Sequence, residues 1–317
     1  MAEAFIQANH LKKYFKTPRG MLHAVDDVTL SIPKGKTLGI VGESGCGKST
    51  LGRLMLNLLE PTSGEMLLDG QNIYKLRSSQ MKKMRTRAQM IFQDPYSSLN
   101  PRMSVSEIIA EPIIANDLIK NRQDIQKRVE ELMDTVGLAQ RFINAYPHEL
   151  DGGRRQRIGV ARALAVNPEF IVCDEPVSAL DVSIQAQILN LMMDLQDELG
   201  LTYVFITHDL SVVKHISDEI AVMYLGQCVE RVPSKELFQN PLHPYTKALL
   251  SAIPIPDLST RGRKRQILTG EVKSPIEPKP GCRFAARCPN ATAACVGHVC
   301  NLKEVEPNHF VSCVLYE

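Results

Sequence analysis

Short apolar runs alternate with helix-like periodic stretches from the start of the chain to about Glu230. The apolar runs are bounded by turn or polar residues, which is typical of buried strands; they are residues 37–41, 88–92, 170–173 and 201–206. Helical periodicity is found at residues 48–59, 124–136 and 183–199. Strands that alternate with helices predict an α/β fold whose parallel sheet is covered on both faces.

Two regions depart from this alternation. Residues 94–144 are mostly helical in pattern and contain no strand candidate, which predicts a helical insertion that we place at about 94–165. Beyond Leu237 the chain is punctuated by proline, as in residues 240–245 and 274–280, and such punctuation favours loops. We therefore expect a main domain at 1–232 and a small loop-rich extension at 233–317.

Composition narrows the class of protein only slightly. The 317 residues are 44% hydrophobic and 23% charged, as in ordinary globular proteins. A formal net charge of +2 leaves no basic excess, so no nucleic-acid partner is expected. The N-terminus lacks a signal-peptide pattern, and no segment approaches the ~18 apolar residues of a membrane helix. We expect a cytoplasmic protein that does not itself cross a bilayer.

A phosphate-binding motif follows the first apolar run. Residues 42–50 read Gly-Glu-Ser-Gly-Cys-Gly-Lys-Ser-Thr, which matches G-x-x-x-x-G-K-[ST] between a strand and a helix. Backbone N–H groups of such a loop surround the phosphates of ATP, the lysine adds charge at the β- and γ-phosphates, and the serine hydroxyl binds Mg²⁺. The predicted ATP-binding residues are Gly42, Ser44, Gly45, Cys46, Gly47, Lys48, Ser49 and Thr50, with Ser49 also a magnesium ligand.

Two carboxylates end the apolar run at 170–173. Asp174 is predicted to hold magnesium, and Glu175 to polarise the attacking water. Such a pair alone is more often a solvated loop, but the phosphate loop favours the catalytic interpretation. These two elements predict a P-loop nucleoside triphosphatase, which still includes motors, helicases, kinases and transporter subunits.

Further motifs resemble the ATP-binding cassette (ABC) family. Residues 150–157 read Leu-Asp-Gly-Gly-Arg-Arg-Gln-Arg, close to the family marker Leu-Ser-Gly-Gly-Gln, and Gln93, Asp181 and His208 follow in the family's order. The resemblance implies a P-loop domain with an ABC-type antiparallel β subdomain and a helical insertion. It also implies that Gln93 links magnesium and water to the membrane subunit, and that Asp181 joins the two cassettes.

The same resemblance assigns two more residues. His208 would contact the γ-phosphate, although a lone strand-end histidine more often binds backbone. An N-terminal aromatic would stack on adenine, and Phe15 fits that position best, with Tyr14 close behind. A single aromatic is equally compatible with core packing, so both readings of Phe15 stay open.

Asp151 departs from the family marker, which has serine at this position. The marker residues Asp151, Gly152, Gly153 and Arg154 would act in the ATP site of a second cassette. Serine donates a hydrogen bond to the γ-phosphate, whereas a carboxylate brings a like charge. Asp151 either disables that site or caps the following helix with Arg154 and Arg155 offsetting its charge. A heterodimer with a related cassette is therefore favoured.

A closer resemblance is to the cassette subunits of oligopeptide and dipeptide importers, a group that includes nickel importers. It rests on residues 93–102, 174–183 and 240–246. The resemblance implies an ATPase that powers solute import from the cytoplasmic face of the membrane. Its partners would be a second cassette, two membrane permease subunits and, indirectly, an extracytoplasmic solute-binding protein.

Two alternatives of other classes remain open. A soluble cassette protein acting on ribosomes or DNA normally needs a second cassette or a long coiled-coil insertion, and the sequence has neither a second phosphate loop nor sustained heptads. A degenerate cassette that binds ATP mainly as a regulatory partner is suggested by the altered marker.

Cysteines crowd the last tenth of the chain. In a reducing compartment this crowding suggests metal before disulfides. Four thiolates close either a zinc site or an iron-sulfur cluster, and the lack of paired C-x-x-C spacing favours the cluster. The resemblance points to a [4Fe-4S] cluster on Cys282, Cys288, Cys295 and Cys313. Reduced thiols packed in a loop-rich lobe remain the alternative, and Cys300 either substitutes for a ligand or stays free.

Overall fold

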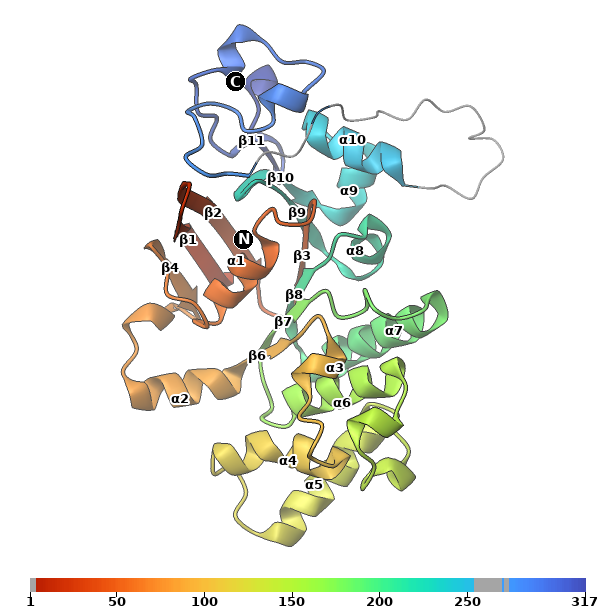
Figure 1. Cartoon of the computed structure of the whole chain (residues 1–317). Helices are drawn as coiled ribbons and strands as arrows, with labels where there is room; N and C mark the ends of the chain where they lie inside the picture. Colours follow the sequence, from red (N-terminus) through yellow and green to blue (C-terminus); the bar gives the residue numbers. More distant parts are fainter. Residues whose placement is uncertain (1–3, 254–269, 271–273) are drawn as a thin grey trace, which may run out of the picture. The chain divides into compact units, whose positions relative to one another are not determined.

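The computed structural model describes residues 4–253, 270 and 274–317 (Figure 1). Residues 1–3 and two stretches of the proline-rich extension, 254–269 and 271–273, lie outside the described part. The chain forms two compact units. The helix-rich unit contains residues 4, 33–36 and 72–206, and the sheet-rich unit contains residues 5–32, 37–71 and 207–317.

Three parallel strands form the centre of the helix-rich unit, and these are β6 (Ala88–Ile91), β7 (Phe170–Asp174) and β8 (Thr202–Ile206). Every residue of β7 and β8 is buried. Continuous burial of this kind is typical of parallel strands covered on both faces, as the apolar runs in the sequence predict.

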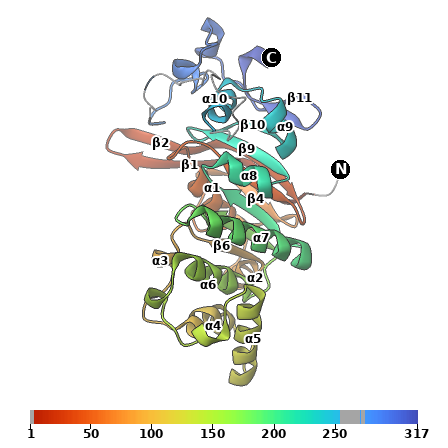
Figure 2. The same cartoon turned by 90° about the vertical axis from the view of Figure 1, so that its right-hand side faces the viewer.

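Helices make up the rest of this unit (Figure 2). They are α2 (Ser78–Arg87), α3 (Pro95–Ser98), α4 (Val105–Ala115), α5 (Arg122–Thr135), α6 (Gly152–Leu164) and α7 (Val182–Leu199). The helix α6 packs against α3, α4, α5 and α7. The expected insertion from residue 94 onward is helical in the structure, with short 3-10 turns Gln140–Phe142 and Pro147–Glu149 before α6.

The sheet-rich unit contains an antiparallel sheet near the N-terminus. Its strand order is β2 (Gly20–Pro33), β1 (Ala4–Thr17), β4 (Ser63–Leu68) and β5 (Gln71–Asn72). The pairing of β1 with β4 shifts register between Asn9 and Lys12. This sheet is the antiparallel β subdomain that the family resemblance implies.

A second group of strands lies in the same unit, in the order β11 (Lys303–Glu306), β12 (His309–Val311), β10 (Gln227–Pro233), β9 (Glu219–Tyr224) and β3 (Thr37–Val41). The strands β3 and β9 are parallel, and β12 is antiparallel to β10. The loop-rich extension therefore adds two short strands to this group, which its proline-rich sequence does not predict.

Helices of the sheet-rich unit are α1 (Lys48–Met55), α8 (Leu210–Ile216), α9 (Ser234–Gln239) and α10 (Pro244–Ala252). The expected helix at 48–59 is too long, because Asn57 adopts the left-handed φ of 52° and the helix ends at Met55. Within the described part of the chain, no helix is both long and apolar enough to span a membrane.

Candidate functional site

The phosphate loop connects β3 to α1 in the sheet-rich unit (Figure 1). Gly42 and Gly47 have φ of 153° and 104°. A Cβ on Gly42 would lie 2.2 Å from the carbonyl oxygen of Met223, and one on Gly47 would lie 2.0 Å from that of Ala24. Only glycine combines this conformation with such close approach. The predicted ATP-binding residues 42–50 thus share one tight turn at the N-terminus of a helix.

The side chain of Lys48 closes over this turn. It is 5% exposed, and its Nζ donates to the carbonyl oxygens of Gly42 at 2.8 Å and Glu43 at 3.1 Å. Cys46 is buried, and burial raises the pKa of its thiol, so it is a neutral packing group. The loop therefore presents a fixed positive charge beside a helix N-terminus, an arrangement suited to phosphate.

Glu175 and Gln93 lie together in the helix-rich unit. They follow the parallel neighbours β7 and β6, and Gln93 Nε2 donates to Glu175 Oε2 at 2.9 Å. Asp174, at the end of β7, is 3% exposed. Ligands of open α/β sheets bind at the carboxyl ends of the strands, so these three side chains stand where a reacting nucleotide is expected.

The backbone holds Glu175 in an unusual conformation. Its φ is 46°, in the left-handed region that costs free energy for a residue other than glycine. Its N–H donates to the carbonyl of Ile206 at 2.8 Å, and its carbonyl accepts from the Ser178 N–H at 3.3 Å. Strain of this kind is frequent at functional sites.

His208 and the candidate adenine-stacking residues belong to the sheet-rich unit. The N–H of Thr207 donates to the carbonyl of Ile40 at 3.1 Å, which holds the exposed His208 beside the strand leading to the phosphate loop. The ring of Tyr14 stacks on His23 at 3.8 Å and its hydroxyl donates to Asp26. Phe15 is half-buried, with the Lys13 ammonium 5.1 Å from its ring centre. Phe15 thus remains the less engaged of the two rings.

The marker residues begin α6. Asp151 is the N-cap, and its Oδ1 accepts from the Arg154 N–H at 2.8 Å while Oδ2 pairs with the Arg154 guanidinium at 2.6 Å. A Cβ on Gly153 would lie 2.7 Å from the Ile184 side chain, so close packing on α7 requires glycine there. Asp181 caps α7 by accepting from Ile184 N–H at 3.0 Å. The marker and Asp181 therefore lie next to each other.

The four predicted metal ligands are neighbours in the sheet-rich unit, and all eight thiols of the chain are free. Burial raises the pKa of Cys282, and the other three thiols of the set raise it further. Thiolates around one zinc ion are roughly 4 Å apart, given Zn–S bonds of about 2.3 Å. In the described part of the chain, the four do not form a group with ligand atoms within 4.8 Å.

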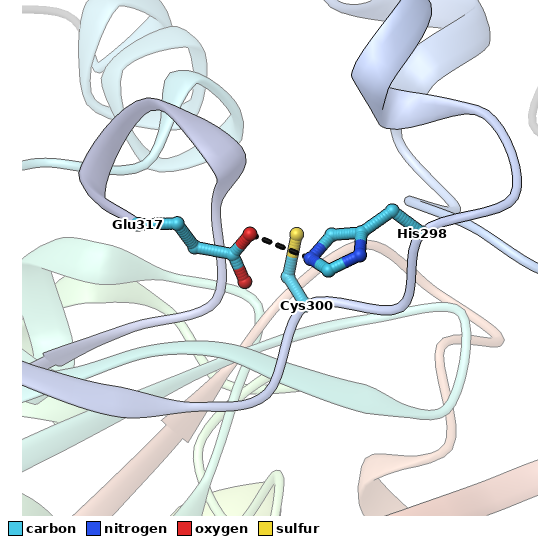
Figure 3. A group of neighbouring side chains, drawn as sticks. All are labelled: His298, Cys300 and Glu317. Carbon is cyan, nitrogen blue, oxygen red and sulfur yellow. Dashed lines mark hydrogen bonds and ion pairs between the residues drawn. The ribbon is translucent and has the colours of Figure 1, made fainter.

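One other group does meet that distance in the described residues, and it contains His298, Cys300 and Glu317 (Figure 3). His298 Nε2 lies 2.6 Å from Glu317 Oε2, and both side chains are accessible to solvent. Burial, followed by the charge of Glu317, raises the pKa of Cys300 to about 11. The group is therefore a solvent-accessible His298–Glu317 contact beside a thiol. Cys300 also lies close enough to Cys282, Cys295 and Cys313 for their charges to raise its pKa, so both interpretations of Cys300 stay open.

Sequence reasoning missed one contact of the phosphate loop. The N–H of Glu43 donates to the hydroxyl of Tyr245 at 2.9 Å. Residues 240–246 are recognisable as a family marker, but Glu43 and Tyr245 are 202 positions apart, so no local sequence signal predicts their contact.

Comparison with known proteins agrees with this geometry. The family model "ABC transporter" matches residues 25–178, and the model "Oligopeptide/dipeptide transporter, C-terminal region" matches residues 229–295. A dimeric, post-hydrolysis structure of the ATP-binding cassette MJ0796 with ADP and Pi has a TM-score of 0.67 and 30% identity, covering 72% of this chain and 98% of that one. The fold and the site define an ATP-hydrolysing cassette.

Relatives match along almost the whole chain. The oligopeptide transport ATP-binding protein OppF of Bacillus subtilis is 52% identical over 315 residues, which cover 99% of this chain and 97% of the relative. OppF of Salmonella typhimurium is 52% identical over 304 residues, covering 96% and 91%. The chain belongs to the ABC transporter family, in the group whose ATPases carry the oligopeptide/dipeptide transporter C-terminal region.

Proposed function

We propose that this ATPase powers the import of di- or oligopeptides, as one of two cassettes docked on a pair of membrane permease subunits at the cytoplasmic face of the membrane. The observation that carries the proposal is identity of about half to peptide-transport ATPases through both the cassette and the C-terminal region. An extracytoplasmic binding protein would deliver the solute to the permeases.

ATP hydrolysis follows from the residues at the strand ends. Glu175 would polarise the attacking water, and Gln93, which already bonds to its carboxylate, would orient that water. Lys48 would neutralise the β- and γ-phosphates, and His208 would bond to the γ-phosphate. The Ser49 hydroxyl and the buried Asp174 carboxylate are oxygen donors that suit Mg²⁺. Magnesium, when bound, supplies charge neutralisation at the phosphates.

Docking on the permeases is assigned to residues 96–102. The ring of Tyr96 is 59% exposed, with the Arg155 guanidinium 4.9 Å from its centre. Asp94 caps the short helix α3 by accepting from the Tyr96 N–H at 2.8 Å, which fixes the direction of this segment. An exposed aromatic on this capped turn, close to Gln93, is suited to contact a helix of another subunit.

The partner cassette is proposed to be a related chain rather than a second copy. Asp151 places a carboxylate where the family marker has a serine, so two copies would give two altered ATP sites. A partner with serine would complete this chain's own phosphate loop and leave the altered marker facing the partner's loop. The same feature supports the second candidate function, a regulatory cassette that binds ATP with little turnover.

Co-purification tests the function directly. The chain, expressed with its neighbouring membrane and binding-protein subunits, should be isolated with two permease subunits and a second cassette, and should drive uptake of labelled di- or oligopeptides. Uptake of Ni²⁺ without uptake of peptide would identify the protein as part of a nickel importer instead of a peptide importer. A complex that binds ATP without hydrolysing it would favour the regulatory candidate.

A [4Fe-4S] cluster on Cys282, Cys288, Cys295 and Cys313 is the proposed cofactor of the extension. A four-iron cluster binds each of four thiolates to a different iron, and Cys288, Cys295 and Cys313 lie close enough to Cys282 for their charges to raise its pKa. A proline-rich lobe with little apolar periodicity also gains stability from a metal crosslink.

Anaerobic purification tests the cluster. The protein should be brown, with equal amounts of iron and acid-labile sulfide. The broad visible absorption should be lost in Cys288→Ser and kept in the matched control Cys300→Ser. Colourless anaerobic protein with neither iron nor zinc would leave the lobe as a docking surface of reduced thiols.

A further inference from the structure

Two arginines of the cysteine-rich lobe (residues 281–317) reach into the nucleotide-binding part of the sheet-rich unit. The guanidinium of Arg287 binds Glu43 of the phosphate loop in a bidentate manner, with Nη1 to Oε2 at 2.8 Å and Nη2 to Oε1 at 3.0 Å. The Arg287 side chain is 9% exposed. Bidentate arginine–carboxylate pairs fix orientation as well as charge.

The same loop residue is held from a second direction. The Glu43 N–H donates to the buried Tyr245 hydroxyl. The rings of Tyr245 and Tyr224 pack around Phe284 of the lobe, with ring centres 5.4 Å and 5.2 Å from it, and Phe284 is 1% exposed. The lobe is thus anchored in the core of this unit, and Arg287 extends from that anchor to the loop.

Arg283 makes a parallel connection. Its side chain is 7% exposed and donates to Asp26 and to the carbonyl of Leu225. Asp26 also accepts a hydrogen bond from the Tyr14 hydroxyl. Gly226, the residue after Leu225, donates its N–H to the carbonyl of Cys46 at 2.8 Å. Arg283 therefore stabilises both the candidate adenine region and the turn that supports the phosphate loop.

We propose that the cysteine-rich lobe positions the phosphate loop for ATP, with Arg287 as the positioning residue. Glu43 is part of the motif that surrounds the phosphates, and its carboxylate would repel ATP if it were unpaired. Arg287 neutralises that charge and holds it away from the loop's interior.

The inference rests on the proposed function only in taking residues 42–50 to bind ATP. Its test is ATP affinity, measured by calorimetry on the full chain carrying Glu175→Gln to suppress turnover. Arg287→Met should weaken ATP binding about tenfold, because it leaves the Glu43 carboxylate unpaired. Arg287→Lys should recover part of the loss. The exposed lobe cation Lys303 supplies the matched control, since Lys303→Met should leave the affinity unchanged.

A second substitution separates positioning from charge neutralisation and from misfolding. In Glu43→Gln/Arg287→Met the unpaired charge is gone but the bidentate contact is still absent, so ATP affinity should recover only part of the loss. Unchanged affinity in Arg287→Met would overturn the proposal, and so would a double variant with the parent's affinity, which would show that Arg287 acts by charge alone. Normal ATP binding without peptide uptake would instead count against the proposed function and leave the positioning role standing.

Discussion

The cassette motifs and the cysteine-rich lobe are held in place by different kinds of interaction. Glu175 and Thr207 are fixed by backbone hydrogen bonds at the ends of strands, and the phosphate loop by its glycine turns. The lobe is held by the pairing of β12 with β10, and its connection to the phosphate loop is made by side chains, among them Arg283, Arg287 and Phe284. Catalytic geometry in this chain is therefore a property of strands and turns, whereas the connection between the lobe and the phosphate loop depends on a few long-range side-chain contacts.

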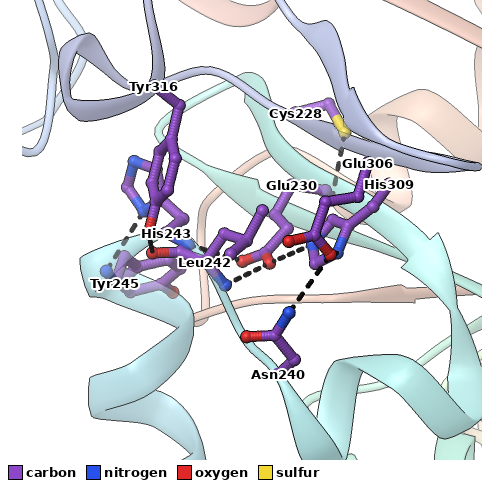
Figure 4. A network of polar contacts seen from close by, with 9 residues as sticks. All are labelled: Cys228, Glu230, Asn240, Leu242, His243, Tyr245, Glu306, His309 and Tyr316. Carbon is purple, nitrogen blue, oxygen red and sulfur yellow. Dashed lines mark hydrogen bonds and ion pairs between the residues drawn. The ribbon is translucent and has the colours of Figure 1, made fainter.

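A buried polar network elsewhere in the sheet-rich unit also connects distant segments through a side chain (Figure 4). The carboxylate of Glu230, on β10, is fully buried and accepts from the Leu242 N–H at 2.7 Å and the His243 N–H at 3.0 Å. It also lies 2.7 Å from His309 Nε2 of β12. One carboxylate thus joins three segments of the C-terminal region, so its loss would leave several buried groups unpaired.

The largest expected effect is the loss of ATP hydrolysis when the proposed catalytic base is removed. Glu175→Gln should lower the turnover that depends on this subunit's site by at least about 10²-fold while keeping ATP binding, because the amide cannot act as a base. Lys48→Ala should instead weaken binding itself. ATP hydrolysis by the assembled complex and ATP affinity of the isolated chain measure the two effects.

A matched control for this variant is Glu198→Gln, which neutralises an exposed carboxylate on α7. It should leave turnover unchanged. If Glu175→Gln hydrolysed ATP at the parent rate, the assignment of the base would be wrong, whatever the state of the lobe.

Sequence alone predicts the cassette side well. The apolar runs predicted β3, β6, β7 and β8 to within one residue at each end, because continuous apolarity is the sequence signature of a buried parallel strand. They did not include β9, which is parallel to β3. The phosphate-loop motif could be placed between a strand and a helix because an apolar run precedes it and helical periodicity follows it. The helix at 48–59 was predicted too long, because nothing in the periodicity marks the left-handed Asn57.

The lobe could not be derived in this way. Strands β11 and β12 form only because β10 offers an edge, and the Arg287–Glu43 pair joins residues 244 positions apart. Such contacts have no periodic or local signal. The positions of the cysteine thiols in space likewise do not follow from their spacing in the sequence, and that spacing does not specify a metal.

An intermediate effect should appear in the stability of the C-terminal region. Burial lowers the pKa of His243 to about 4 from 6.5, against the opposing charge of Glu230. Between these pH values the unfolded chain binds more protons than the folded one, so this contribution to stability is present above pH 6.5 and is lost as pH falls toward 4. At pH 5.5 the loss should be about 1.4 kcal/mol relative to pH 7.5.

Urea unfolding of the parent and His243→Asn at pH 7.5 and 5.5 measures this contribution. Asparagine preserves the cap of α10, where the His243 Nδ1 accepts from the Tyr245 N–H, but it does not titrate. Between pH 7.5 and 5.5, the free energy of unfolding of His243→Asn should therefore fall by about 1.4 kcal/mol less than that of the parent. The exposed His10→Asn should follow the parent. An identical pH dependence in parent and His243→Asn would show that His243 does not titrate on unfolding.

The smallest expected effect concerns the marker. An unpaired carboxylate 4 Å from a phosphate would cost about 4 kcal/mol at an effective dielectric constant of about 20. Asp151 is paired with Arg154 and 58% exposed, which reduces the expected cost to about 1 kcal/mol. Serine also caps a helix, so Asp151→Ser changes the charge and little else. We expect it to raise turnover at the partner's site roughly fivefold.

That site is observed separately when this chain also carries Glu175→Gln, since the remaining hydrolysis then comes from the partner's phosphate loop and this chain's marker. Asp124→Ser, which removes an exposed carboxylate from the first turn of α5, is the matched control and should have no effect. A fivefold rise would establish that Asp151 weakens the partner's site through its charge. Equal turnover in Asp151→Ser and its parent would mean that Asp151 serves only as the cap of α6, and that asymmetry between the two cassettes has to come from the partner.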